Sequence, residues 1–406
     1  MRTDGRMAEQ EQRPSPAYQV LKVLYAPQKA FKQILKEPKY AGPALVMILF
    51  IAANVGYGYA VLSKTYVEQT IPQAGQLNQW NDNATKWTSN VNKTENFNDY
   101  INGSYYGNNS IEFSAINSSR VFVELMNIGP VDCSEPNGYK NMSFRIKIVD
   151  PQISPANAAI YLFSQENSSA TGNSSGYFYQ NLTDTFLNIS STVWNNLTIS
   201  IGPTGQWQTI DDANWTDITG LKLEFSWLGN SNVTLLVDGL FFRGIFESPL
   251  QTAGASYLID YGIVGLLEFG VQWIFASGLI LVIAKAFGAK ITWKPILVAV
   301  GFAFIILLVQ SIINAVAVST LPNLYYTLEY IGGTQAEMNA GANKLYTETW
   351  LVSAIMGYVR LVVYIWIIAL CASATRLLTS FSWVKSILVA AVAFIVTIVI
   401  TLLLGV

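Results

Sequence analysis

The sequence predicts an α-helical membrane bundle of five transmembrane helices into which an all-β jelly-roll sandwich is inserted. Three observations predict this fold class. Five long apolar runs lie along the chain, the stretch between the first two alternates apolar and polar residues as strands do, and that stretch holds all thirteen Asn-x-Ser/Thr triplets. The charged fraction of 12% is also far below the roughly 25% of a soluble domain.

Each apolar run is long enough for a transmembrane helix, which takes about 20 residues. The runs are Ala41–Leu62, Gly262–Ala284, Pro295–Ser319, Trp350–Ala372 and Ser386–Leu404. We therefore predict a cytoplasmic tail over 1–40, a first span over 41–62, an external stalk over 63–103, a glycosylated sandwich ectodomain over 104–252, and the other four spans within 253–406.

Basic residues predict the orientation, because Lys and Arg near spans are retained on the cytoplasmic side. Eight precede Ala41, three connect the second and third runs, and two connect the fourth and fifth, whereas the 30-residue loop Thr320–Thr349 holds only Lys344. The chain is therefore predicted to be a multi-pass plasma-membrane protein with a cytoplasmic N-terminus. The ectodomain and Val406 are predicted to be extracellular. The first apolar run has spanning length and is expected to act as an uncleaved anchor.

A short amphipathic helix is expected just before the first span. Pro27 suits a helix start, Ala30, Phe31, Ile34 and Leu35 share one face, and Lys29, Lys32 and Lys36 share the other. An interfacial helix among anionic headgroups fits this pattern. The alternative is a solvated helix end without a lipid role.

The clustered triplets predict N-glycosylation. The stretch Lys64–Thr252 has 24 Asn and 36 Ser or Thr in 189 residues, so chance pairing under the acceptor rule would give about 5 triplets. Polar composition alone is the alternative explanation. The predicted acceptors are Asn83, Asn92, Asn102, Asn108, Asn117, Asn141, Asn167, Asn173, Asn181, Asn188, Asn196, Asn214 and Asn232.

Composition excludes several kinds of chemistry. The chain has no histidine, which rules out Ser-His-Asp and Cys-His catalysis and histidine metal ligation. Cys133 and Cys371 fall on different sides of the predicted membrane, and Cys133 is expected to be buried or, alternatively, to bridge to another chain. The stretch Lys64–Thr252 has 17 acidic and 9 basic residues, a net of −8, which disfavours nucleic acid as a partner.

Polar residues inside the spans predict an intramembrane layer formed by Asn54, Glu268, Gln310, Asn314 and Arg360. Charges at such depth are normally paired, so Glu268 and Arg360 are expected to meet. A hydrogen-bonded layer that fixes helix register is the favoured interpretation. An ion or substrate path is the alternative.

The ectodomain shows the period of two that half-buried strands produce. Met142–Ile148 and Leu221–Trp227 alternate strictly, and six further runs make about eight strands, which favours a two-sheet jelly roll. The further runs are Ser110–Ser114, Val121–Met126, Ala159–Ser164, Gly176–Leu182, Trp194–Ile201 and Asn232–Arg243.

The membrane half resembles the Yip1 domain family of five-span proteins, in its prokaryotic, archaeal-type branch. The similarity lies in Val23–Phe31 leading to Tyr40-Ala-Gly-Pro43, in Ile283–Lys290 with Trp293-Lys294, and in Tyr364-Ile-Trp366 with Ser382–Lys385. The eukaryotic members act in secretory traffic and place an acid ahead of the Gly-Pro. Here Lys39 and Tyr40 stand there, so the trafficking role is not carried over.

The ectodomain resembles galactose-binding-like jelly rolls, the fold of many carbohydrate-binding modules. The similarity lies in Trp194–Ile199, Trp207, Trp215–Leu223 and Leu236–Gly244. The resemblance implies a structural role for Asp238.

Aromatic side chains suggest a sugar ligand, because pyranose C–H faces stack on them. Trp207, Trp215 and Tyr177 are the candidate binding residues, with core packing as the alternative. Asp211, Asp212 and Asp217 would be the oxygen ligands of a Ca²⁺ ion, although a solvated acidic turn is favoured and no cofactor is expected.

The sequence therefore predicts a non-enzymatic membrane protein that presents a glycosylated sandwich outside the cell. The expected partners are the lipid bilayer, its own N-linked glycans, and an envelope glycan or protein; no catalytic or metal-binding residue is assigned. The alternatives are a transporter or channel, a membrane-organising Yip1 protein with a trafficking-like role, and a cell-surface glycan hydrolase, which would need two facing carboxylates that no spacing singles out.

Overall fold

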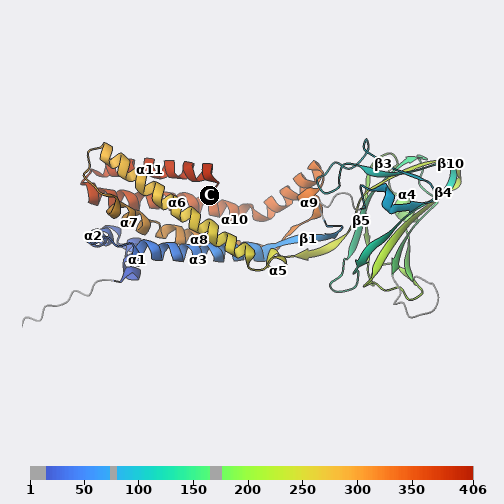
Figure 1. Cartoon of the computed structure of the whole chain (residues 1–406), viewed down its shortest axis with the longest axis horizontal. Coiled ribbons are helices and arrows are strands. Elements are labelled where there is room, and N and C mark those ends of the chain that lie inside the picture. The colour runs from blue at the N-terminus through green and yellow to red at the C-terminus, as the bar shows by residue number, and fades with distance from the viewer. Residues whose placement is uncertain (1–14, 74–79, 165–175, 406) are drawn as a thin grey trace, which may run out of the picture. The chain divides into compact units, whose positions relative to one another are not determined.

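The computed structural model describes residues 15–73, 80–164 and 176–405. The chain forms two compact units, each built from segments far apart in the sequence (Figure 1). The helical unit takes the residues up to Thr65, Ser248–Asn323 and the residues from Glu348 onward. The sandwich unit takes Tyr66–Glu247 together with Leu324–Thr347.

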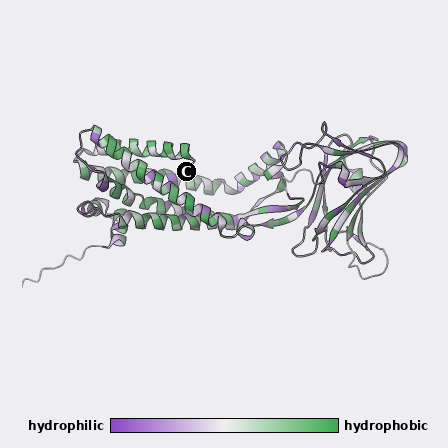
Figure 2. Cartoon of the chain, in the orientation of Figure 1, coloured by the Kyte–Doolittle hydropathy of each residue, from purple (hydrophilic) through white to green (hydrophobic). Residues whose placement is uncertain are grey.

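Five helical segments are long and apolar enough to cross a membrane, as predicted: Ala41–Lys64, Ser256–Ala286, Trp293–Ser319, Gln335–Thr379 and Trp383–Leu404. Their hydrophobic composition is visible in Figure 2. The third segment divides at Phe304 into two helices. The helices of this part are α1 (Pro16–Tyr25), α2 (Pro27–Ile34), α3 (Ala41–Lys64), α5 (Pro249–Thr252), α6 (Ser256–Ala286), α7 (Trp293–Ala303), α8 (Ile305–Ser319), α10 (Gln335–Thr379) and α11 (Trp383–Leu404).

The third span forms the centre of the helical unit. Two thirds of its most apolar window, 67%, is buried, against 22–33% for the other four spans, so these four keep apolar surface for lipid. Aromatic rings pack against one another at the centre. The ring centroid of Phe269 on α6 lies 5.8 Å from that of Phe50 on α3 and 5.6 Å from that of Phe304. Such contacts at 4.5–7 Å favour a fixed packing of helices.

The apolar face of α2 packs within the helical unit. Ala30, Phe31 and Ile34 are buried in its core cluster, while Lys29 and Lys32 are exposed. The amphipathic pattern therefore serves helix packing, and an additional contact of the lysines with headgroups stays a prediction.

Strands form the second unit. They are β1 (Thr65–Ile71), β2 (Trp87–Ser89), β3 (Asn92–Asn96), β4 (Ser110–Val131), β5 (Asn141–Asp150), β6 (Asn157–Ser164), β7 (Tyr177–Asn181), β8 (Asn195–Ser200), β9 (Gln208–Ile210), β10 (Ile218–Glu247) and β11 (Leu324–Tyr326). Short helical turns accompany them: η1 (Ala84–Lys86), α4 (Thr183–Leu187) and α9 (Leu328–Gly332).

Two long bent strands organise the sandwich. β4 and β10 pair along most of their length, from Val131 opposite Ile218 to Ile111 opposite Val237, and the register shifts around Ser226–Ser231. The first layer runs β2-β4-β10-β6-β7-β9, and the second runs β3-β4-β10-β5-β8. Pairs of predicted strand runs are thus single strands that pass from one layer to the other, and the predicted antiparallel sandwich is confirmed.

The sandwich core lies between the two layers, and the alternation seen in the sequence places its members. Val123, Leu223 and Leu162 come from the first layer, and Phe113 and Phe144 come from the second; all five belong to one buried cluster. Residues between them in the sequence point outward, as the pleat of a strand requires.

The predicted external stalk over 63–103 is wrong. Trp80 and Trp87 are buried in the sandwich core, with the Trp87 Nε1 donating to the Trp80 carbonyl at 2.8 Å. β2 and β3 in the same stretch pair with β4. Polar residues on edge strands gave this stretch a linker-like composition that concealed its two core tryptophans.

The loop expected at Thr320–Thr349 is also different, because most of it belongs to the sandwich unit. β11 extends the sheet beside β1. Leu328 is buried with Ile101, Tyr106 and Phe241. We call Leu324–Thr347 the docking segment. Its strand pairing and the burial of Leu328 make it part of the sandwich unit.

Candidate functional site

The outer face of the second layer is covered by the chain itself. Ile101 and Tyr106 lie over this layer with Phe241 and Leu328 in a small buried cluster. Asp238, on the same face of β10, is fully buried and accepts a hydrogen bond from the Ile101 backbone N at 2.9 Å. The first layer differs, because its outward side chains remain accessible.

Four aromatic side chains of β6 and β7 line the outer face of the first layer. Register places Tyr161 opposite both Lys222 and Tyr179, and Phe163 opposite Tyr177. The Tyr161 ring centroid lies 5.3 Å from that of Tyr179 and 5.8 Å from that of Tyr177, and Phe163 lies 6.2 Å from Tyr177. All four are half-buried. We call Tyr161, Phe163, Tyr177 and Tyr179 the aromatic face.

Charged groups border the aromatic face on β10 and β4. The Lys222 ammonium lies 4.8 Å from the Tyr161 ring centroid and 2.8 Å from a Glu224 carboxylate oxygen. Glu224 also pairs with Arg120. Burial alone would raise the pKa of Glu224, but the hydrogen bonds and charges of Lys222 and Arg120 lower it overall. Glu224 is therefore the counter-charge of both cations beside the aromatic face.

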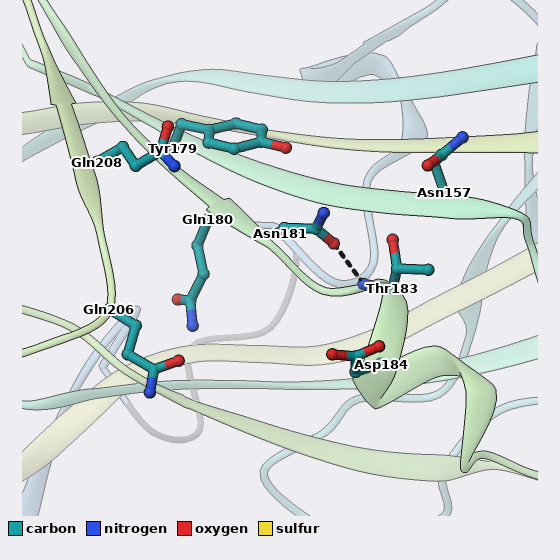
Figure 3. A pocket seen from close by; sticks show the side chains of 8 residues that line it. All are labelled: Asn157, Tyr179, Gln180, Asn181, Thr183, Asp184, Gln206 and Gln208. Atoms are coloured by element: carbon teal, nitrogen blue, oxygen red, sulfur yellow. Dashed lines mark hydrogen bonds between the residues drawn. The ribbon is translucent and has the colours of Figure 1, made fainter.

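A polar pocket of about 460 Å³ adjoins the aromatic face at the end of β7 (Figure 3). Tyr179 lines both. Gln180 and Gln206 lie on the same side of the pocket in Figure 3, and the Gln180 Oε1 is buried without a hydrogen-bond partner. The lining residues are Asn157, Tyr179, Gln180, Asn181, Thr183, Asp184, Gln206 and Gln208. Such amide, hydroxyl and carboxylate groups suit a polyhydroxylated ligand.

The sequence-predicted ligand residues divide between two environments. Tyr177 lies on the aromatic face. Trp215 stacks on core Phe178 with ring centroids 3.7 Å apart, and Trp207 packs against Trp215 at 5.6 Å while its Nε1 donates to the Ser200 carbonyl at 2.9 Å. Both tryptophans pack against the sandwich core. The structure therefore places them in the packing role that the sequence left as the alternative.

The predicted glycan acceptors lie at the surface wherever the structure describes them. Asn83 and Asn141 are half-exposed and the other nine are exposed, whereas Asn81 and Asn109, which begin no triplet, are buried. Asn167 and Asn173 lie outside the described residues. Every described triplet thus has an accessible asparagine, and glycosylation itself stays a prediction.

Two arginines fasten the docking segment to the sandwich. Arg243 donates to Glu68 at 2.7 and 2.9 Å and to Glu329 at 2.7 Å. Arg145 contacts Glu337 at 2.5 Å and the Tyr106 hydroxyl at 2.9 Å. Burial raises the pKa of Tyr106 to about 12, against the opposing effect of Arg145.

The intramembrane polar residues do not form the predicted ion pair. Glu268 accepts from the Gln272 Nε2 at 3.2 Å, and among the described residues no ion pair joins it to Arg360, whose side chain is exposed on α10. Asn54 donates to the Tyr261 carbonyl at 2.8 Å and so links α3 to α6. The side-chain carbonyl oxygens of Gln310 and Asn314 are buried without hydrogen-bond partners.

Metal ligands do not converge within the part of the chain that the structure describes, where no group of three or more Asp, Glu, Cys or His side chains is present. Asp211 and Asp212 are exposed after β9. Cys133 is buried, as expected, and burial raises the pKa of its thiol, which makes it a poor nucleophile.

The fold and these surfaces define a class: a multi-pass membrane protein whose helices carry an inserted antiparallel sandwich. Residues 203–404 match the family model of the Yip1 domain. The predicted resemblance is thereby confirmed, and the chain contains a Yip1 domain. The match begins ahead of β10 and includes four of the five spans; the quoted stretches before Ala41 and the first span lie outside it.

No curated protein matches the chain. Solved structures are similar to its sandwich part. A family 11 carbohydrate-binding module from Clostridium thermocellum shares 12% identity, covering 44% of this chain and 96% of that one, with a TM-score of 0.29. A family 30 module of a Clostridium thermocellum cellulase shares 11%, covering 41% and 95%, with a TM-score of 0.31. A β-1,2-glucanase from Parabacteroides distasonis shares 14%, covering 43% and 22%, with a TM-score of 0.26.

Sequence reasoning missed Tyr161, Phe163 and Tyr179. A usable signal was present, because Tyr161-Leu162-Phe163 and Tyr177-Phe178-Tyr179 place aromatic residues at the outward positions of two strands. Outward aromatics on neighbouring strands have no core to fill, so they mark an accessible surface. The ion pairs of the docking segment had no comparable signal, since their partners lie 86 and 192 residues apart.

Proposed function

We propose that this protein presents a glycosylated sandwich outside the cell and binds neutral glycans through the aromatic face. The observation that carries the proposal is the row of Tyr161, Phe163, Tyr177 and Tyr179, which remains open on one layer while the chain covers the other. Flat rings of this kind stack on the C–H faces of sugars. The neighbouring amides of Gln208 and Asn157 supply hydrogen bonds to hydroxyl groups.

A neutral ligand fits the charge balance. Lys222 and Arg120 both pair with Glu224, so each of these two basic groups beside the rings already has a carboxylate partner. The net charge of −8 over Lys64–Thr252 adds to this preference. The proposed protein is a binder and not an enzyme.

External placement is supported by the helical unit. Figure 1 shows the α6–α7 and α10–α11 connections at the same end of this unit as α2. All three carry basic residues: Lys29 and Lys32, Lys285 and Lys290, and Arg376 and Lys385. Basic residues gathered at one end favour a cytoplasmic location for that end.

Glycan binding by the purified full chain in detergent tests the proposal. We expect array binding to neutral glycans with a dissociation constant of about 10⁻⁴ M. Tyr161→Ala and Tyr179→Ala should weaken it at least tenfold, whereas Phe97→Ala, an exposed aromatic away from the aromatic face, should leave it unchanged. Equal binding by all three variants would reject the aromatic face as the site.

A further inference from the structure

The pocket at the end of β7 contains a predicted glycan acceptor in its own wall. Asn181 lines the pocket and begins the triplet Asn181-Leu182-Thr183. Its Oδ1 accepts a hydrogen bond from the Thr183 backbone N at 2.8 Å, as Figure 3 shows. The oxygen is thus engaged, and Nδ2 is the atom to which an N-linked sugar attaches. Asn181 is exposed, so this atom is accessible.

The walls of the pocket match a neutral sugar. Gln180 and Gln206 offer amides that both donate and accept hydrogen bonds, and the carboxylate of Asp184 accepts from hydroxyl groups. Among the described lining residues Asp184 alone is charged, and its negative sign disfavours an anionic sugar. The ring of Tyr179 supplies an apolar patch at the rim.

The side-chain amide of Gln180 has an unsatisfied hydrogen-bond acceptor. Its Oε1 is buried without a hydrogen bond, and a buried acceptor without a donor destabilises the folded state. Rotation of the Gln180 amide toward a hydroxyl or amide N–H in the pocket would satisfy it. A ligand that stays in the pocket therefore improves the protein's own hydrogen bonding.

We propose that this pocket is the seat of the glycan attached to Asn181, with the first sugar held between Gln180, Gln206 and Asp184. The inference rests on the external, glycosylated placement proposed above. A tethered sugar has an effective concentration of about 1 mM or more, which is well above a dissociation constant of about 10⁻⁴ M for a single weak sugar site. The chain's own glycan therefore fills the pocket, and the aromatic face remains available to free glycans.

Protection of the Asn181 glycan from an enzyme tests this inference. The full chain is produced in a eukaryotic host that adds oligomannose glycans, purified folded in detergent, and treated with an endoglycosidase that cuts between the first two sugars. Glycopeptide mass spectrometry then follows release at each asparagine. Asn117 and Asn232, both exposed and outside the pocket, are the internal controls. We expect release at Asn181 to be at least tenfold slower than at either control.

Pocket variants make the test specific. Gln206→Ala, and Gln180→Ala with Gln206→Ala, should bring release at Asn181 to the control rate while the rates at Asn117 and Asn232 stay constant, which also reports that the fold persists. Equal release at all three sites in the unaltered chain overturns the inference. The inference is also overturned if Asn181 carries no glycan while Asn117 and Asn232 do. That outcome would leave the proposed external placement intact. Absence of glycan at every site would refute both this inference and the proposed external, glycosylated placement.

Discussion

Arg243 and Glu329 form a bidentate ion pair that joins β10 to the docking segment. The Arg243 Nη2 lies 2.7 Å from the Glu329 Oε2, and the second contact is made through Nη1. Glu68 of β1 binds the same guanidinium and also accepts from the Leu328 backbone N at 2.9 Å. One arginine thus ties together β1, β10 and the stretch that leads into α10.

Removing one partner of this pair should loosen the docking segment. In Glu329→Gln the Arg243 charge keeps only Glu68, and we expect a loss of about 1–3 kcal/mol in unfolding free energy. Hydrogen exchange should show faster exchange over Leu324–Gly332 than in the unaltered chain. Glu348→Gln, an exposed change on α10, is the matched control. Equal protection in both variants would mean that burial of Leu328 alone holds the segment.

Asp238 should make the sandwich more stable as the pH falls below about 8. Burial raises the pKa of Asp238 to about 8, against an ordinary value of 3.8. A carboxyl with a raised folded-state pKa favours folding when protonated, so its contribution is complete near pH 4 and is lost as the pH rises through 8. The slope is at most about 1.4 kcal/mol per pH unit.

Denaturant unfolding followed by tryptophan fluorescence, between pH 5 and pH 9, measures this dependence. Asp238→Asn should flatten the profile, because the amide cannot ionise and its oxygen still accepts the Ile101 or the Gly239 backbone N–H. Glu329 acts in the opposite sense: its pKa is lowered by Arg243 in spite of burial, so its contribution is lost only in acid, below the range scanned. A profile unchanged by Asp238→Asn would contradict the raised pKa.

Local patterns in the sequence predicted the fold well, and long-range contacts were beyond them. Apolar run length gave the five spans, and alternation in Met142–Ile148 and Leu221–Trp227 gave strands that the structure confirms. The polar composition of 63–103 led to the incorrect prediction of a stalk, because the two buried tryptophans of this stretch lie among many asparagines in the sequence. The docking segment was missed because its fit depends on Glu68 and Arg243, which are brought to it only by the folded sandwich.

Trp215 and Tyr161 should respond differently to truncation. Trp215 stacks on buried Phe178, so Trp215→Ala removes core packing and should lower the unfolding free energy by about 3–5 kcal/mol. Tyr161 packs against the outward side chains of Tyr177 and Tyr179, so Tyr161→Ala should cost less than half of that while reducing glycan binding. Thermal unfolding of the full chain in detergent compares them. A larger loss in Tyr161→Ala would reverse the assigned roles.

Glu268 and Arg360 should be only weakly coupled, because a charge interaction acts between them without a hydrogen-bonded ion pair. Since Glu268 is hydrogen-bonded to Gln272 and no ion pair with Arg360 is present in the described residues, the melting-temperature shifts of Glu268→Gln and Arg360→Gln in detergent should add to within the small effect of that interaction. The double variant measures the coupling directly. Recovery of stability in the double variant would show that the two charges meet in the membrane, as the sequence alone predicted.

Labelling of lysines on intact cells should place the sandwich outside. Lys86 and Lys140 are exposed on the sandwich unit, and Lys29 and Lys32 are exposed on α2. A membrane-impermeant amine reagent should therefore modify the first pair at least tenfold more than the second, because basic residues gathered around α2 favour the cytoplasmic side. Permeabilised cells, in which both pairs should react, control for intrinsic reactivity. Modification of Lys29 and Lys32 but not of Lys86 and Lys140 on intact cells would invert the orientation and remove the basis for external glycan binding.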